Sequence, residues 1–141
     1  MESKLQRLID VYAQERRLYG EILRHVRCQR ELIDAGAGYA QINAELARKR
    51  ELLQEVEALE RGVREDRELW RQRRHELDGG GAKLLLALLA EVTVLVEEIL
   101  ERERENEILL TTRRRRALAP LAGLRQAAAS YRRHGGAEVK A

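Results

Sequence analysis

Apolar residues recur at seven-residue spacing through most of the chain, which is the spacing of helices that pack along one face. In the first segment five such residues share one phase: Leu5, Tyr12, Tyr19, Val26 and Ile33. This repeat predicts a coiled-coil-like helix over residues 3–35. Gly36 and Gly38 follow it, and glycines at this place end a helix and allow the chain to reverse.

A second segment keeps the same spacing and predicts a helix over residues 40–78. Charged residues interrupt its apolar stripe, so we expect its outer half to be only partly covered, with aliphatic stems packed and charged ends in water. Gly79, Gly80 and Gly81 then end the helix. The seven-residue phase is kept by Ile42, Val56, Val63, Trp70 and Leu77, and Trp70 is expected in the core.

The third segment predicts a helix over residues 82–119 whose first half is apolar on most of its circumference. Such a helix should lie against both of the others, because an exposed surface of this kind would aggregate in water. Asn106 falls at a core-like position, where we interpret it as a polar residue that sets the helix register. Pro120 should kink or restart the helix, because proline removes one helical hydrogen bond.

Together these patterns predict an all-α fold, an elongated antiparallel three-helix bundle or coiled coil with a kinked or mobile C-terminal helix. At about 1.5 Å per residue each helix would extend roughly 50 to 60 Å, and short glycine turns favour antiparallel neighbours. Residues 1–119 would form the scaffold, and residues 120–141 a C-terminal binding extension of the same domain.

The composition agrees with this fold and places the chain away from membranes. Charged residues make up 36% of its 141 residues, with no Phe and one Pro, as in long helices and coiled coils. The apolar run 84–100 contains Glu91, Glu97 and Glu98, so no membrane insertion is expected. A single cysteine and a start without the apolar core of a signal peptide predict a cytoplasmic protein.

No enzyme motif is present, so we expect no catalytic residues and no cofactor. The sequence GGGAK lacks the P-loop spacing, and neither a nucleophile elbow nor an H-E-x-x-H pair occurs. His25 and Cys28 could share a helical face, but two ligands do not make a zinc site, so no metal is expected.

Charge is distributed unevenly along the chain. Residues 108–141 carry eight Lys or Arg against one Glu, a formal charge of +7, whereas the whole chain carries +3. Leucines accompany these arginines, which indicates an incomplete helical surface awaiting another protein's helix. The candidate binding residues are Leu109, Leu110, Arg113, Arg114, Arg115, Arg116, Leu118, Leu121, Leu124 and Tyr131.

Three stretches in this order resemble the FlgN family of flagellar export chaperones. They are ERRLYGEILRHVRCQRELIDAG, then AELARKRELLQEVEALE, then Asn106 and Leu109 ahead of a terminal Tyr131-x-x-x-Gly135. The resemblance implies a cytoplasmic chaperone that keeps hook-associated proteins, its clients, competent for the flagellar type III export apparatus. It also implies that the C-terminal region binds an amphipathic helix of the client.

Two other classes of function stay open from the sequence. One is a structural coiled-coil component of an export apparatus, against which the third apolar segment argues. The other is a basic helical protein associated with nucleic acid, which the arginine run alone supports, without a helix-turn-helix or stacking aromatics. Nucleic acid is therefore not the expected partner, and a homodimer is left open because a second copy could cover an exposed third helix.

Overall fold

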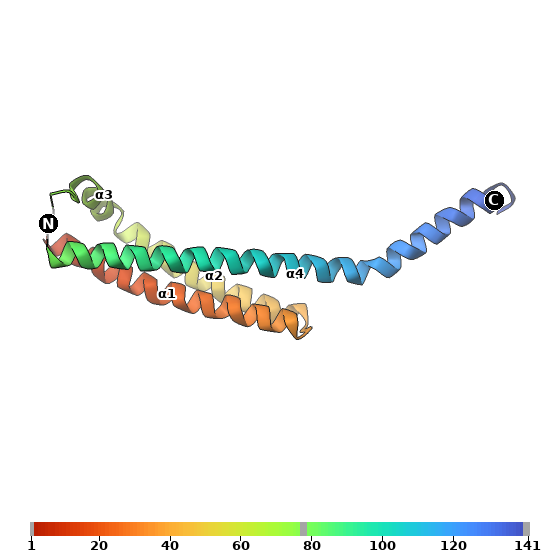
Figure 1. Cartoon of the computed structure of the whole chain (residues 1–141), viewed down its shortest axis with the longest axis horizontal. Helices are drawn as coiled ribbons and strands as arrows, with labels where there is room; N and C mark the ends of the chain where they lie inside the picture. Colours follow the sequence, from red (N-terminus) through yellow and green to blue (C-terminus); the bar gives the residue numbers. More distant parts are fainter. Residues whose placement is uncertain (1, 77–78, 140–141) are drawn as a thin grey trace. The chain divides into compact units, whose positions relative to one another are not determined.

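The fold is all-helical, with four helices and no strand in the part of the chain that is described. This computed structural model describes the backbone of residues 2–76 and 79–139 and the side chains of residues 3–76 and 79–116. The helices are α1 (Glu2–Asp34), α2 (Tyr39–Gly62), α3 (Arg64–Arg73) and α4 (Gly80–Val139), shown in Figure 1. The prediction of an all-α fold is confirmed, but three helices were expected where there are four.

The turn after α1 is the one predicted from Gly36. Gly36 has a φ of +71°, a conformation that glycine adopts without steric cost. Its N–H donates to the carbonyl of Ile33 at 3.1 Å, and the N–H of Ala37 donates to that of Leu32 at 2.9 Å. These two bonds form a Schellman motif, which satisfies carbonyls that the helix end would otherwise leave unpaired.

The single helix predicted over residues 40–78 is wrong in two respects, because it is divided at Val63 and because its second part ends at Arg73. Val63 has φ −119° and ψ 13°, which lies outside helical geometry, and its carbonyl accepts from the N–H of Arg67 at 2.8 Å as α3 begins. Gly62 precedes it and is a poor helix former, at about 1 kcal/mol less favourable than alanine. The break turns Val63 inward, where its side chain is 2% exposed.

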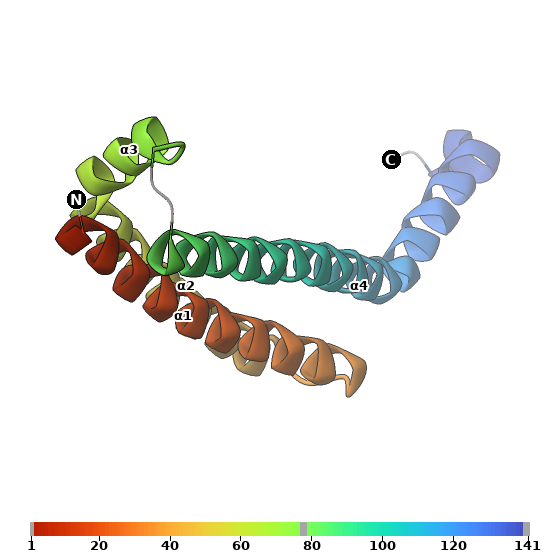
Figure 2. The same ribbon diagram turned by 60° about the vertical axis from the view of Figure 1, so that its left-hand side comes forward.

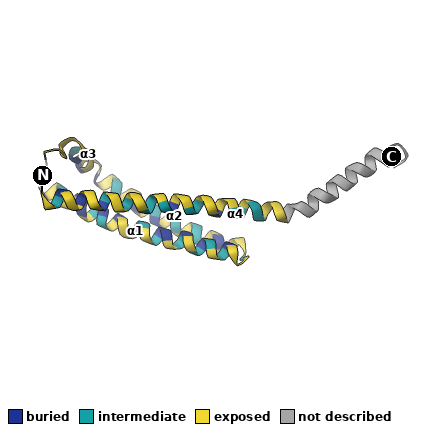
Figure 3. Cartoon of the chain, in the orientation of Figure 1, coloured by how far each residue is buried: buried dark blue, intermediate teal, exposed yellow. Residues whose placement is uncertain are grey.

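Two hydrophobic clusters hold α1, α2, α3 and the first part of α4 together. In Figures 1 and 2, α1, α2 and the first part of α4 run alongside one another, and α3 lies at the end where α1 begins. In Figure 3 the buried residues accordingly lie mainly where these helices face one another. Trp70 is 5% exposed, so its expected place in the core is confirmed. One cluster contains Leu8, Ile9, Tyr12, Val63, Trp70, Ala82, Leu85 and Leu88. The other contains Leu18, Ile22, Leu23, Val26, Leu52, Val56 and Ile99.

Polar contacts set the direction of α4 against α1. Arg16 pairs with Glu91 at 2.6 Å and Arg27 with Glu98 at 2.9 Å, so the two helices run parallel with α2 antiparallel to both. Hydrogen bonds from Arg27 and Arg102 hold the pKa of Glu98 below its ordinary value.

Asn106 lies in α4 toward the end of its contact with α1, and it is buried, at 3% exposure. Its Nδ2 donates to the backbone carbonyl of Val26 at 3.1 Å, which ties α4 to α1 at a single register. The structure therefore agrees with the interpretation of Asn106 as a register-setting residue.

The chain divides into two compact units, Met1–Asn106 and Glu107–Ala141. We call the first unit the body. The helical assignment of α4 covers residues on both sides of Pro120, so a separate helix starting there is not observed. Within the described residues, no helix is both long enough and apolar enough to cross a membrane.

Candidate functional site

The predicted C-terminal residues fall on α4 beyond the body, and six of the ten have described side chains. Leu109, Leu110 and Arg113 are half-buried, whereas the side chains of residues 114–116 are exposed. Ile108, which the prediction omitted, is 58% exposed. The remaining predicted residues, Leu118, Leu121, Leu124 and Tyr131, lie outside the residues whose side chains are described.

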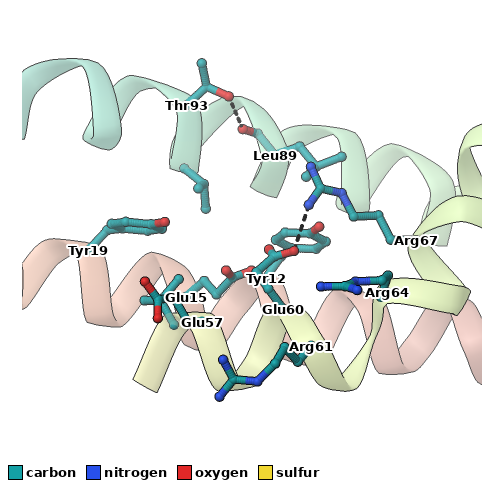
Figure 4. A pocket seen from close by; sticks show the side chains of 12 residues that line it. Tyr12, Glu15, Tyr19, Glu57, Glu60, Arg61, Arg64, Arg67, Leu89 and Thr93 are labelled. Atoms are coloured by element: carbon teal, nitrogen blue, oxygen red, sulfur yellow. Dashed lines mark hydrogen bonds and ion pairs between the residues drawn. The ribbon is translucent and has the colours of Figure 1, made fainter. Parts of the chain in front are cut away.

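A second candidate, which the sequence analysis missed, is a pocket of about 650 Å³ within the body. This volume falls in the range of small-molecule sites, which is about 300 to 1,000 Å³. All four helices contribute to its lining, as Figure 4 shows. The lining residues are Tyr12, Glu15, Tyr19, Val56, Glu57, Glu60, Arg61, Arg64, Arg67, Leu89, Val92 and Thr93.

Two buried polar side chains of α1 lie on the wall of this pocket. Glu15 is 1% exposed and Tyr12 is 4% exposed. Neither the Glu15 Oε2 atom nor the Tyr12 hydroxyl has a hydrogen-bond partner among the described residues that meets ordinary geometry. Both groups nevertheless interact with the Glu60 side chain, and this hydrogen-bonding interaction contributes to the raised pKa of each.

Burial raises the pKa of Glu15 to about 8, and the neighbouring Glu60 carboxylate acts in the same direction. Glu60 is itself held by Arg67, whose Nη1 donates to Glu60 Oε2 at 2.7 Å, and the positive charge of Arg67 partly opposes the shift. Burial also raises the pKa values of Tyr12 and Tyr19. Glu15 is therefore mostly protonated at neutral pH.

The remaining lining divides into apolar walls and a charged rim. Val56, Leu89 and Val92 supply the apolar walls, from α2 and α4. Thr93 adds no free donor, because its hydroxyl donates to the carbonyl of Leu89 at 2.8 Å. The side chains of Arg61 and Arg64 are exposed at the rim. The site thus combines the carboxyl groups of Glu15 and Glu60 with apolar side chains and exposed arginines.

A signal for Glu15 was present in the sequence. Leu8, Glu15, Ile22 and Gln29 are seven residues apart, and all four are buried. Glu15 therefore occupies a core position in a row adjacent to the one that predicted the helix. A carboxyl in such a row is a candidate for a perturbed pKa.

No group of three or more metal-ligating side chains occurs in the described parts of the chain. His25 Nδ1 contacts Glu45 Oε2 across α1 and α2, and Cys28 is a half-buried free thiol.

Comparison of the chain with protein-family models, with curated proteins and with solved structures finds no match. The molecule has two candidate binding surfaces, the C-terminal segment and the pocket over Glu15.

Proposed function

We propose that this protein is a non-enzymatic, cytoplasmic export chaperone that binds hook-associated flagellar proteins through the C-terminal part of α4. Binding would cover an amphipathic helix of the client and keep it competent for the flagellar type III export apparatus. The proposal extends the resemblance to the FlgN family.

One observation carries the proposal: α4 continues as a helix past the residues that build the body. Among the described side chains, no member of either hydrophobic cluster lies beyond Ile99. The helical assignment nevertheless runs on to Val139. No carboxylate occurs between Glu107 and Glu138, so this segment does not neutralise its own arginines. A helical segment whose sequence combines leucines with an excess of basic residues is suited to an amphipathic partner helix with acidic groups.

Leucines and arginines would have different tasks in this complex. Leu109 and Leu110 would bury against the apolar stripe of a client helix, which supplies most of the affinity. The run Arg113–Arg116 would speed encounter with an acidic client surface and set the salt dependence of the association rate.

Two finer features of the fold belong to the same proposal. We propose that α1, the α2–α3 pair and the first part of α4 form one elongated three-helix bundle in which successive segments run antiparallel. We further propose a kink at Pro120, because proline clashes with the preceding turn and lacks a donor. Such a kink would let the last residues of α4 close over a client helix.

The test measures affinity for the terminal helix of a hook-associated protein by calorimetry. Truncation after Arg116, or the double change Leu109→Ala and Leu110→Ala, should weaken binding at least tenfold. The matched control is Leu84→Ala with Leu86→Ala, two leucines of α4 that are about half exposed on the body. This control should bind as the parent does.

Unchanged affinity of the truncated chain, with its helical content retained, would contradict the proposal. Retention on heparin that collapses with salt, together with no binding to the client helix, would instead favour the nucleic-acid alternative.

A further inference from the structure

We propose that a second copy of this chain covers the outer face of α4 over residues 83–97, with the two α4 helices antiparallel and Ala90 on the two-fold axis between them. This surface belongs to the body and lies wholly before the C-terminal segment. Pairing at this surface is therefore independent of the export function proposed above.

The outer face of α4 is exposed along its length and apolar at its centre. Leu86 is 51% exposed and Val94 is 62% exposed. Residues three and four apart lie on the same side of a helix, so these side chains and Ala90 between them form one continuous patch. Aligned exposed apolar residues are typical of an interaction surface, whereas scattered ones are not. The outer face consists of Lys83, Leu86, Ala87, Ala90, Thr93, Val94 and Glu97, all of them exposed, and exposed residues run along this part of α4 in Figure 3.

A shallow hollow of about 460 Å³ adjoins this face on the side of α1. The atoms that line it are almost all apolar, and Ala90 and Val94 belong both to the hollow and to the outer face. Its one carboxylate is already paired, because Arg16 Nη1 donates to Glu91 Oε2 at 2.6 Å. A helix packed along the outer face would therefore cover mainly apolar surface.

The order of residues along the outer face makes it complementary to itself in the antiparallel direction. A two-fold axis at Ala90 places each residue before Ala90 opposite the residue at the same distance after it. Leu86 then meets Val94, and Lys83 meets Glu97, once on each side of the axis. Apolar side chains thus meet at the centre and opposite charges meet at both ends.

This self-complementarity is what favours a second copy over a different protein. A two-fold dimer uses the same patch on both subunits, so the patch must fit itself. The small side chain of Ala90 suits the axis, because the distance between two packed helices depends on the side chains at their contact.

The charges at the two ends of the face are available for pairing with a second copy. The ion pairs between α4 and α1 use Glu91, Glu98 and Glu105. Within the described residues, the ion pairs of α4 include neither Lys83 nor Glu97.

Other arrangements of two α4 helices bring like charges together. Parallel pairing in register sets Lys83 against Lys83 and Glu97 against Glu97. An antiparallel axis one heptad later sets the two copies of Glu97 against each other, and an axis one heptad earlier does the same with Lys83. Like charges across a helix pair select against that arrangement, so the axis at Ala90 is preferred.

The first experiment measures association of the full chain by sedimentation equilibrium. The contact extends over about 21 Å of helix, which is short for a stable interface, so we expect a dissociation constant on the order of 100 µM. The average mass should rise from that of one chain toward that of two as the concentration passes this value. Ala90→Glu should weaken association by about tenfold or more, because it sets two carboxylates on the axis. Ala47→Glu, the same change at an exposed alanine of α2, should leave it unchanged.

Charge reversal tests the register of the pair. Lys83→Glu and Glu97→Lys should each weaken association by about fivefold, because each puts like charges together at both ends. An equimolar mixture of these two variants should associate as the parent does, since every glutamate at these positions then faces a lysine of the other chain. Neither variant alters a buried residue, so both should fold.

Disulfide cross-linking tests the direction of the two helices. With Cys28→Ser to remove the natural thiol, Ala90→Cys should form a covalent dimer on oxidation, because both copies of residue 90 lie at the axis. Lys83→Cys should not, because its two copies lie about 21 Å apart and a disulfide needs Cα atoms within about 7 Å.

A mass of one chain at all concentrations up to about ten times the expected constant would overturn the proposal. Association that Ala90→Glu leaves intact would overturn it as well, because the dimer would then use another surface. Cross-linking of Lys83→Cys as readily as of Ala90→Cys, or a mixture of charge variants no better than either alone, would contradict the antiparallel register.

Discussion

Glu15 occupies a position at which the seven-residue pattern calls for an apolar side chain. Leu8 and Ile22, its neighbours in that row, are both fully buried. A carboxyl between them must lose most of its hydration, and this loss, reinforced by Glu60, favours the protonated form. Ionisation of Glu15 therefore destabilises the folded body, and this effect depends on pH.

We predict that the free energy of unfolding falls as pH rises from about 4.5 to about 8 through the titration of Glu15. In this window the folded state keeps the proton and the unfolded state loses it, so stability declines with pH. One such proton contributes a slope of at most about 1.4 kcal/mol per pH unit. Above about 8 both states are ionised and the slope vanishes.

Glu15→Gln should remove that slope and raise the urea midpoint at pH 8 more than at pH 5, with Glu57→Gln as the exposed control. Equal pH dependence of the parent and Glu15→Gln chains would show that Glu15 is not protonated in the folded state. Urea unfolding at the two pH values measures the difference.

At the scale of the element, α4 presents opposite environments at consecutive residues. Leu85 is 0% exposed and belongs to a hydrophobic cluster, whereas Leu86 is 51% exposed. Successive residues of a helix point about 100° apart, so neighbours in sequence can lie on different faces. Only one side of the apolar run of α4 is therefore buried in the core.

Leu85→Ala should destabilise the body by about 2 to 5 kcal/mol, because it removes transfer free energy and leaves a cavity between α1 and α4. Leu86→Ala, the same chemical change one residue later, should alter stability by no more than about 0.5 kcal/mol. Urea unfolding monitored by circular dichroism gives both values. Equal losses would contradict the assignment of α4's buried face.

The break between α2 and α3 is also an element-scale feature, and it positions the pocket. Glu60 lies before the break and Arg67 after it, and their ion pair spans the change of direction. Gly62, the residue that weakens the helix there, was visible in the sequence. The apolar phase continues across it through Val63 and Trp70, which is why a single helix was expected.

At the scale of the whole molecule, the contacts that stabilise the body can be named. Among the described side chains, both hydrophobic clusters lie before Asn106, and an ion pair between Arg30 and Glu105 joins α1 to α4 near the end of the body. The body therefore has the contacts that a self-sufficient folding unit needs.

We predict that truncation after Arg116 leaves the urea midpoint of the body unchanged, because the described members of both clusters all lie at or before Ile99. Far-ultraviolet circular dichroism should lose only the helical signal of the deleted residues. A loss of more than about 2 kcal/mol in the free energy of unfolding would indicate that the deleted residues pack in the core. The same truncated chain serves in the client-binding test.

The sequence determined the helical class, the turn at Gly36, and the burial of Trp70 and Asn106, because each follows from local periodicity or from one residue's conformational preference. It also indicated the uneven charge of the last third, which is a matter of counting. The kink at Pro120 and the client site stay predictions. The break of the second helix at Val63 and the approach of Glu60 to Glu15 in the pocket became visible only in the folded structure. Both features depend on contacts between residues of different helices. The spacing of residues along the sequence does not show which of them come into contact.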